Sequence, residues 1–281
     1  MKLILTVNHI NHAFAVYDTE SEVVELLPYV DELEDQRASG GKKPPMHPYG
    51  ITSDDKHIYI ASHGKIGQFD KCTLQYKGLH PIKTDIDTHQ LTFFHDELIV
   101  ANTSQHSLSI YSCGHTTLFD VCDHDQHVNS LTAYDNHLYV AVRYLSAVAN
   151  FNSVIKVYDR YFNLVDQYNT FMRKQHNIHV DDTHVYTLCS RDYKLIKINR
   201  KTKKSQSVSL DLPPSYYMRG MQYYNDTMYI MASLDPYDYF TSELRQPALL
   251  LTIKDDDLTV NELPDILTPV SDIHVLETTN S

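Results

Sequence analysis

Polar and titratable residues that could do chemistry recur in this sequence at intervals of 40 to 52 residues. The recurring positions are Tyr49, His89, Asn129, His176, Arg219 and Ser271. Further polar residues beside them are Gln90, Asn177, Asp272 and, two residues before Asn129, His127. Every member of this series can donate or accept a hydrogen bond. A position that only fills space would be small or aliphatic, so the series predicts a polar functional site.

Three histidines of this series predict a metal centre. His89 and His176 hold the same place in two copies, so we expect their imidazoles to converge, with His127 close by. Neutral imidazole binds Zn²⁺, Mn²⁺ or Fe²⁺, and two or three such ligands with an open position make a catalytic centre. The expected cofactor is therefore one divalent metal ion.

The other residues of the series predict a small anionic ligand. Arg219 and Tyr49 are the candidate catalytic residues, because guanidinium holds a carboxylate or phosphate bidentately and the phenol can move a proton. The candidate ligand-binding residues, which would orient the ligand by hydrogen bonds, are Asn129, Gln90, Asn177 and Asp272. The same residues also suit a channel that holds only ordered water, and this alternative stays open.

Other catalytic and metal motifs are weaker or absent in the sequence. Cys113, His115, Cys122 and His124 have ligand types that suit zinc, but their Cys-x-His spacing is not the usual one. A nucleophile turn of the G-x-S-x-G type, a Walker sequence and a G-x-G-x-x-G loop are all missing. The polar series is therefore the main functional signal.

An internal repeat predicts the elements that position these residues. Five copies share a short apolar strand, an Asp- or Asn-rich turn, a strand alternating Tyr with β-branched residues, and a further strand. The copies span 50–70, 90–111, 130–159, 177–198 and 220–253. Period-two strands with such turns indicate antiparallel sheet, and the interval is that of a four-stranded propeller blade.

The two ends of the sequence complete a sixth copy. Segments 3–7 and 13–18 match the second and third strands of a unit, and 271–276 matches the missing first strand. We therefore predict an all-β, six-bladed β-propeller of four-stranded antiparallel blades, closed by the C-terminal strand pairing with the N-terminal strands. It would be one domain over 1–281, with blade 1 shared between 1–28 and 270–277 and blades 2–6 within 47–264.

Composition excludes several classes of protein. The chain has 281 residues with 36 acidic and 24 basic side chains, so its formal net charge is −12, which argues against nucleic-acid binding. Apolar runs are too short to cross a membrane, and no signal-peptide core precedes the first strand. Four scattered cysteines suit a reducing compartment, so we expect a cytoplasmic protein.

The repeat resembles those of the NHL and SMP-30-like six-bladed propellers. The resemblance rests on 48–51, with sequence Pro-Tyr-Gly-Ile, then on Asp54-Asp55, on 58–61 and on 68–70. SMP-30-type lactonases hold a divalent metal with a Glu of the N-terminal blade, a residue that segment 3–7 lacks. The resemblance thus implies the architecture, and it implies no individual site residue.

Two functions fit the sequence. The favoured one is a small-ligand- or metal-binding propeller whose site lies at the mouth of the central channel, with a metal-dependent lyase or hydrolase as the expected enzyme class. The alternative is a non-catalytic scaffold that engages a protein partner through the propeller face and the loops at 144–153 and 235–247. Fold alone does not choose between them.

Overall fold

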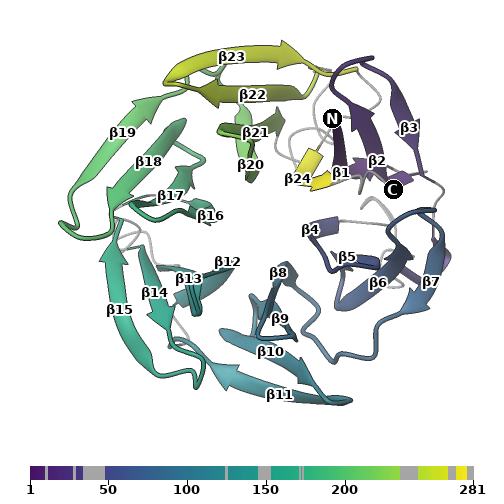
Figure 1. The fold of residues 1–281 in the computed structure, drawn as a ribbon, viewed down its shortest axis with the longest axis vertical. Helices are drawn as coiled ribbons and strands as arrows, with labels where there is room; N and C mark the ends of the chain where they lie inside the picture. Colours follow the sequence, from purple (N-terminus) through teal and green to yellow (C-terminus); the bar gives the residue numbers. More distant parts are fainter. Residues whose placement is uncertain are drawn as a thin grey trace. The chain divides into compact units, whose positions relative to one another are not determined.

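The computed structural model is built almost entirely of β-strands. It describes residues 1–9, 12–27, 30–33, 48–123, 126–144, 153–170, 172, 174–234, 246–264 and 270–276. Their contacts divide the chain into two compact units, one made of 1–80 with 213–281 and the other of 81–212. Each unit contains three four-stranded antiparallel sheets, drawn in Figure 1. The predicted all-β chain of six four-stranded antiparallel sheets is confirmed.

The first unit contains twelve of the strands. Its first sheet has the order β24 (Val270–Leu276), β1 (Lys2–His9), β2 (His12–Asp18) and β3 (Val24–Leu26). The second consists of β4 (Pro48–Ser53), β5 (His57–Ser62), β6 (Lys65–Asp70) and β7 (Tyr76–Leu79). The third consists of β20 (Tyr216–Tyr224), β21 (Thr227–Leu234), β22 (Leu249–Lys254) and β23 (Asp257–Glu262). The short 3₁₀ helix η1 (Asp31–Leu33) contacts β6.

The second unit contains the other twelve strands. One sheet is formed by β8 (Thr88–Phe94), β9 (Glu97–Asn102), β10 (Ser107–Ser112) and β11 (His115–Asp120). The next is formed by β12 (Gln126–Tyr134), β13 (His137–Tyr144), β14 (Val154–Tyr158) and β15 (Leu164–Asn169). The last is formed by β16 (Gln175–Val180), β17 (His184–Cys189), β18 (Lys194–Asn199) and β19 (Ser205–Ser209).

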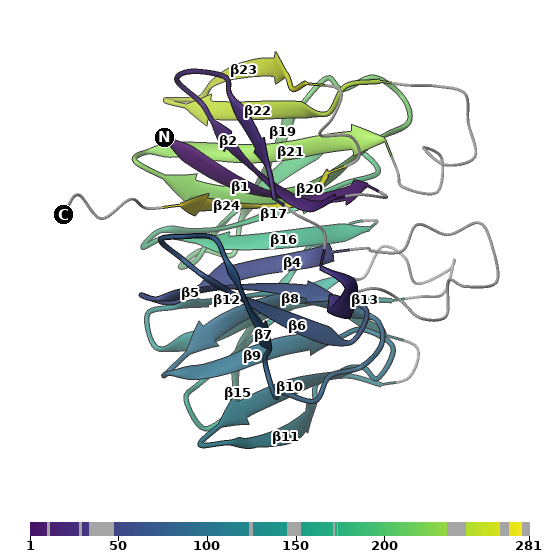
Figure 2. The same cartoon turned by 90° about the vertical axis from the view of Figure 1, so that its right-hand side faces the viewer.

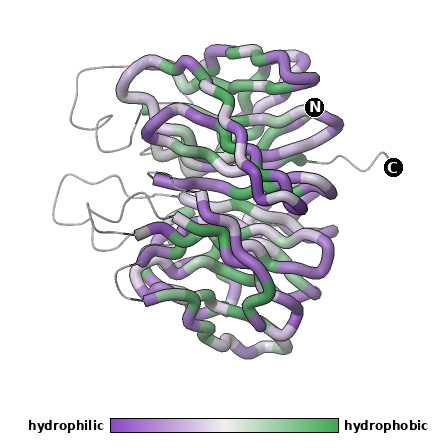
Figure 3. The backbone as a smooth tube through the Cα atoms, turned by 90° about the vertical axis from the view of Figure 1, so that its left-hand side faces the viewer, coloured by the Kyte–Doolittle hydropathy of each residue, from purple (hydrophilic) through white to green (hydrophobic). Residues whose placement is uncertain are grey.

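Burial falls from the second strand of a sheet to the fourth. In β5, Ile58 and Ile60 lie on the same face of the strand and are buried in one cluster with residues of the first sheet, such as Ile4 and Val16. The fourth strands β19 and β23 are exposed along their whole length. In Figure 3 the strands carry many hydrophobic residues, while hydrophilic colour gathers at turns. Each apolar cluster thus packs one face of one sheet against the next, as layered sheets require.

The C-terminal strand completes the first sheet. β24 pairs antiparallel with β1, with Leu3 opposite Val275 and Leu5 opposite Ile273. Figures 1 and 2 both show β24 beside β1. This pairing covers an edge of β1 that would otherwise expose unpaired backbone groups. The prediction that the C-terminal strand joins the N-terminal strands is confirmed.

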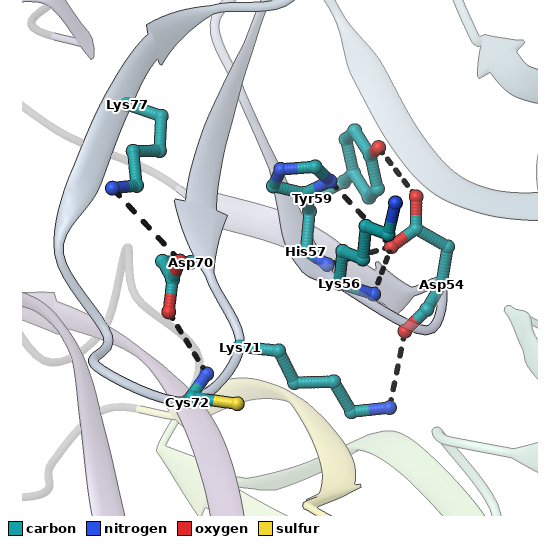
Figure 4. Close-up of polar contacts among 8 residues, drawn as sticks. All are labelled: Asp54, Lys56, His57, Tyr59, Asp70, Lys71, Cys72 and Lys77. Carbon is teal, nitrogen blue, oxygen red and sulfur yellow. Dashed lines mark hydrogen bonds and ion pairs between the residues drawn. The ribbon is translucent and has the colours of Figure 1, made fainter.

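The Asp-rich turns of the repeat are tied by side-chain hydrogen bonds. Asp54 Oδ1 accepts from the backbone N–H of Lys56 at 2.7 Å and of His57 at 2.6 Å, and Tyr59 donates its hydroxyl to Oδ2 at 2.8 Å (Figure 4). Lys71 reaches the carbonyl of Asp54 at 3.1 Å. These bonds to the charged form lower the pKa of Asp54, although burial alone would raise it. The carboxylate therefore fixes the turn between β4 and β5.

Replacing Asp54 with alanine is expected to lower the free energy of unfolding by about 2 to 3 kcal/mol. Two backbone donors and the Tyr59 hydroxyl would lose a charged acceptor. The matched control is Asp55→Ala in the same turn, since Asp55 is exposed, and this change is expected to cost under about 0.5 kcal/mol. Urea unfolding of both variants measures the difference, and equal effects would show that the Asp54 bonds contribute nothing.

The two loops predicted to engage a protein partner lie largely outside the described residues. The sequence assigns the loops at 144–153 and 235–247 to a scaffold function. Residues 145–152 and 235–245 of these loops are not among those that the structure describes. Among the described residues, no helix has the length and apolar character needed to cross a membrane.

Candidate functional site

The first strand of every sheet carries a β-bulge beside the polar position predicted from the sequence. The extra residues are Tyr49 in β4, Asn129 in β12, Asn177 in β16, Gly220 in β20, Ser271 in β24, and the pair 89–90 in β8. A bulge interrupts the ladder and re-aims side chains, and bulges are common beside functional sites. The polar series therefore coincides with an irregular backbone.

The bulge does not keep one place in the repeat. His176 and Arg219 align with Tyr49 and Asn129 by sequence, but the extra residue in their strands is the following one. Asn177 has φ of +50° and Gly220 has φ of +71°, while His176 pairs regularly with Leu188. The sequence pattern gives the spacing of residues but not which residues pair across strands. The shift of the bulge by one residue in β16 and β20 could therefore not be predicted.

In the first unit, Arg219 lies against two tyrosine rings. Its Cζ is 5.5 Å from the ring centroid of Tyr49 and 4.8 Å from that of Tyr217. Both distances are within cation–π range. Nε and Nη1 of the guanidinium are buried and have no hydrogen-bond partner in the described part of the chain. Arg219 thus carries a partly buried positive charge that no carboxylate neutralises there.

The backbone beside Arg219 is held by close contact between two strands. A Cβ at Gly220 would lie 2.9 Å from the Cα of Asp272 on β24, so only glycine fits there. Asp272 is buried, and its Oδ1 accepts the N–H of Ile273 at 2.9 Å. β24 contacts both β20 and β4. The structure therefore gathers the predicted residues Tyr49, Arg219 and Asp272 within one unit.

In the second unit, His89 and His127 form a cluster with two charged residues. His89 Nε2 lies 3.4 Å from Asp87 Oδ1, and the two imidazole rings meet edge to face with centroids 5.9 Å apart. Arg143 Nη2 is 3.3 Å from His127 Nε2. The cluster therefore contains one carboxylate, two imidazoles and one guanidinium.

Burial and the neighbouring guanidinium keep His127 neutral. Burial, followed by the charge of Arg143, lowers the pKa of His127 to about 2. Since a guanidinium can only donate, Nε2 of His127 must be the acceptor and Nδ1 carries the proton. Burial raises the pKa of Asp87, but the hydrogen bonds from His89 and Ser104 and the electrostatic attraction of the two imidazoles together outweigh it, so the pKa falls.

His176 and the asparagines lie in the same unit with partners of their own. His176 Nδ1 is 2.9 Å from Ser190 Oγ and 3.1 Å from the carbonyl of Lys174. Asn129 donates from Nδ2 to the Gln175 carbonyl at 2.9 Å, and its buried Oδ1 has no partner among described residues. The backbone N–H of Asn177 donates to Ser130, and Gln90 is partly buried on β8. These bonds hold the bulged backbone of β12 and β16 together.

The described residues contain no group of three or more His, Cys, Asp or Glu that could hold a metal ion. At the predicted metal position, His127 Nε2 is already paired with a cation, and His176 Nδ1 with a hydroxyl. Of the alternative zinc candidates, His124 lies outside the described residues.

Three residues of these two clusters are not among the candidate site residues predicted from the sequence, and Tyr217 is one whose tyrosine-rich stretch the sequence assigns to the core rather than to a stacking surface. Tyr217 stands two positions before Arg219, on the same face of β20. Asp87 stands two positions before His89. Arg143 lies directly opposite His127 in the β12–β13 hairpin. Tyr217 and Asp87 could have been predicted from the two-residue period of a strand, and Arg143 from the pairing of residues across the hairpin.

Among comparisons with known proteins, only the comparison of structures found similar proteins. No protein-family model matches the sequence, and no curated protein matches it. A protein of unknown function from Bacteroides caccae is 10% identical, with 97% of both chains covered and a TM-score of 0.67. A chain of a nidogen/laminin complex is 9% identical over 97% of both chains, with a TM-score of 0.68.

A virginiamycin B lyase from Staphylococcus aureus is 16% identical, covering 79% of this chain and 71% of that one, with a TM-score of 0.57. With six four-stranded blades, the fold is a β-propeller. At these identities the likeness shows the fold alone. The finer resemblance to NHL and SMP-30-like proteins stays a prediction.

Proposed function

We propose that this protein binds a small anionic molecule through Arg219. The observation that carries the proposal is the partly buried guanidinium whose Nε and Nη1 lack acceptors in the described part of the chain. Removing a charge from water costs several kcal/mol unless an opposite charge or hydrogen bonds compensate it. A bound carboxylate or phosphate would supply both.

The surroundings of Arg219 support a binding role over a structural one. The chain has 36 acidic residues, yet Arg219 forms no ion pair with any described residue. Tyr49 and Tyr217 hold the guanidinium by ring contacts, which leave its hydrogen-bonding capacity unused. An arginine kept for structure would normally pair that capacity with carbonyls or carboxylates.

A catalytic role, where present, falls to the same residues. Tyr49 lies beside Arg219 and can give a proton to, or take one from, a molecule held by the guanidinium. We do not propose the metal-dependent lyase or hydrolase expected from the sequence. The unprotonated nitrogen of His127, which would bind the metal, already accepts a hydrogen bond from Arg143. The proposed activity is ligand binding, with Arg219 as the anchor and Tyr49 as the proton-moving group.

Isothermal titration calorimetry with inorganic phosphate, sulfate, acetate and succinate tests the proposal. We expect at least one of these probes to bind with a Kd of about 1 mM or tighter, and Arg219→Met to weaken it by about tenfold or more. Arg219→Lys keeps the charge but loses the planar fork, so its affinity should lie between the two.

The matched control is Arg200→Met. Arg200 also lies over a tyrosine, with its Cζ 5.2 Å from the Tyr134 ring, but it donates to the carbonyls of Asp181 and Asp182. Its loss should leave anion binding unchanged. Absence of binding by all four probes, or an equal loss in Arg200→Met, would overturn the proposal.

A further inference from the structure

Positive charge is concentrated in one outer hairpin of an acidic chain. Residues 191–204, which span β18 and the turn into β19, contain seven basic residues and one acidic residue, so the segment carries +6. The whole chain carries −12, so the remainder carries −12 − 6 = −18. A basic surface of this kind attracts acidic partners.

Five of the seven cations have no ion-pair partner among the described residues. One of them, Lys197, lies over the Tyr186 ring, and the other four are Arg191, Lys194, Lys201 and Lys204. All four side chains belong to exposed residues. The neighbouring cations are occupied, since Lys203 contacts Asp166 and Arg200 donates to carbonyls of the preceding turn. The unpaired charges therefore lie at both ends of the hairpin and are available to a partner.

The same hairpin ends in an open sheet edge. β19 is the outermost strand of its sheet and pairs with β18 alone. All five of its residues are exposed, and its sequence Ser-Gln-Ser-Val-Ser contains no charge and no proline. Natural sheets usually protect such an edge with charges, proline or a bulge, because its unpaired N–H and C=O groups can pair with another strand.

A pocket of about 250 Å³ lies against this edge. The residues that line it are Ser205, Gln206 and Ser207 of β19, Lys194 and Ile196 of β18, and Thr170, Met172, Cys189 and Asp192. Met172, Cys189 and Ile196 are buried, so the pocket combines apolar walls with the Lys194 ammonium and the Asp192 carboxylate. The carboxylate favours an apolar or basic side chain in the pocket itself, and the acidic side chains of a docked strand would lie toward the exposed lysines. A pocket of this kind can accept one side chain of a strand laid along β19.

We propose that β19 is a docking site for an extended acidic segment of another protein, which adds to the edge as a fifth strand. Backbone hydrogen bonds to β19 would provide affinity, one side chain would enter the pocket, and acidic residues would pair with Lys194, Lys201 and Lys204. The site is independent of Arg219, which lies in the other unit.

Fluorescence anisotropy with a labelled peptide Val-Glu-Val-Asp-Ile-Glu-Val tests the proposal on the full chain. We expect saturable binding that weakens as salt is added. A version N-methylated at alternate residues keeps the charges but loses half of its backbone donors, and we expect about tenfold weaker binding. A version with Lys at the acidic positions should not bind.

The test variant is Lys201→Glu/Lys204→Glu, and the matched control is Lys56→Glu/Lys254→Glu. Lys56 and Lys254 are exposed lysines of other hairpins, so both double variants change the net charge equally. We expect the test variant to bind the peptide about tenfold more weakly and the control to bind it like the parent protein. Hydrogen exchange should slow at 205–209 when the peptide binds.

Several outcomes would overturn the proposal. They are absence of peptide binding, equal binding of the N-methylated peptide, or equal loss in the control variant. Self-association of the parent protein that Lys201→Glu/Lys204→Glu abolishes would assign the edge to a second copy of this chain. Retained peptide binding by Arg219→Met is expected whether or not the anion site exists, so the two proposals fail separately.

Discussion

Replacing Gly220 with alanine is expected to lower the free energy of unfolding by about 2 to 4 kcal/mol, and replacement with valine by more. Gly220 has φ of +71°, a conformation that costs about 1 to 2 kcal/mol for a residue with a Cβ. The added Cβ would also lie 2.9 Å from the Cα of Asp272 and 2.9 Å from the N of Ile273. Both are backbone atoms, so relief requires β24 to move, and overpacking of this kind costs about 1 to 3 kcal/mol.

Gly114→Ala separates the two contributions. Gly114 has φ of +85°, but a Cβ there meets no atom within 4 Å. Its substitution measures backbone strain alone, and the extra loss in Gly220→Ala measures the clash with β24. Urea unfolding at neutral pH gives both values. Equal losses would mean that β24 does not pack on β20 as described.

Mild acid is expected to destabilise the protein through two partly buried histidines. Burial lowers the pKa of His274 to about 4, and Lys71 acts in the same direction. Burial also lowers the pKa of His179 to about 4, against the opposing charge of Asp181. His274 Nε2 lies 2.9 Å from Ser53 Oγ, a contact that joins β24 to β4. Both groups are neutral in the folded protein at pH 7.

Acid lowers the stability of the folded protein because these histidines bind protons more readily in the unfolded chain. Unfolded histidine has a pKa near 6.5, so below that pH the unfolded chain binds protons that the folded chain excludes. Stability is complete above about pH 6.5 and falls until the pH reaches the folded pKa near 4. At 1.36 kcal/mol per pKa unit, each histidine costs about 2 kcal/mol by pH 5 and about 3 kcal/mol by pH 4. Two of them remove a large part of an ordinary stability of about 5 to 15 kcal/mol.

Urea unfolding at pH 7, 6 and 5 measures this loss, and His179→Gln/His274→Gln should flatten it by about 4 kcal/mol over that range. The exposed His95 and His115 provide the control, since His95→Gln/His115→Gln should leave the pH dependence unchanged. Carboxylates with lowered pKa values, such as Asp54 and Asp181, lose their contribution at lower pH, below about 4 to 5. An unchanged slope in the first double variant would contradict the assignment.

The fold could be predicted because its determinants are local and repeated. Each copy shows a turn such as Asp54-Asp55 and a strand such as 58–61, and the missing first strand of the first sheet was found at 271–276. Strand order and the pairing of β24 with β1 follow from that count. The sequence therefore predicted topology well, since every unit repeats the same short-range information.

The candidate site is harder to predict because it depends on strand register and on which charges lie next to each other. Arg219 and Tyr49 were predicted from residue type, and the structure places them in contact. The bulge at Asn177 and Gly220 shifts the pattern by one residue, and no sequence rule counts that residue. The pairing of His127 with Arg143 weakens the metal prediction. These two residues are 16 positions apart in the sequence and meet only because their strands pair.

The pairing of β24 with β1 also sets the order in which the chain can be made and folded. Lys2 pairs with Leu276, so the ribosome must add more than 270 residues between the two halves of one sheet. At about 5 to 20 residues per second this takes roughly 14 to 55 s, during which β1 has an open edge. Until β24 emerges, that edge of β1 can pair with other strands, so the same pairing that closes the finished sheet is absent throughout synthesis.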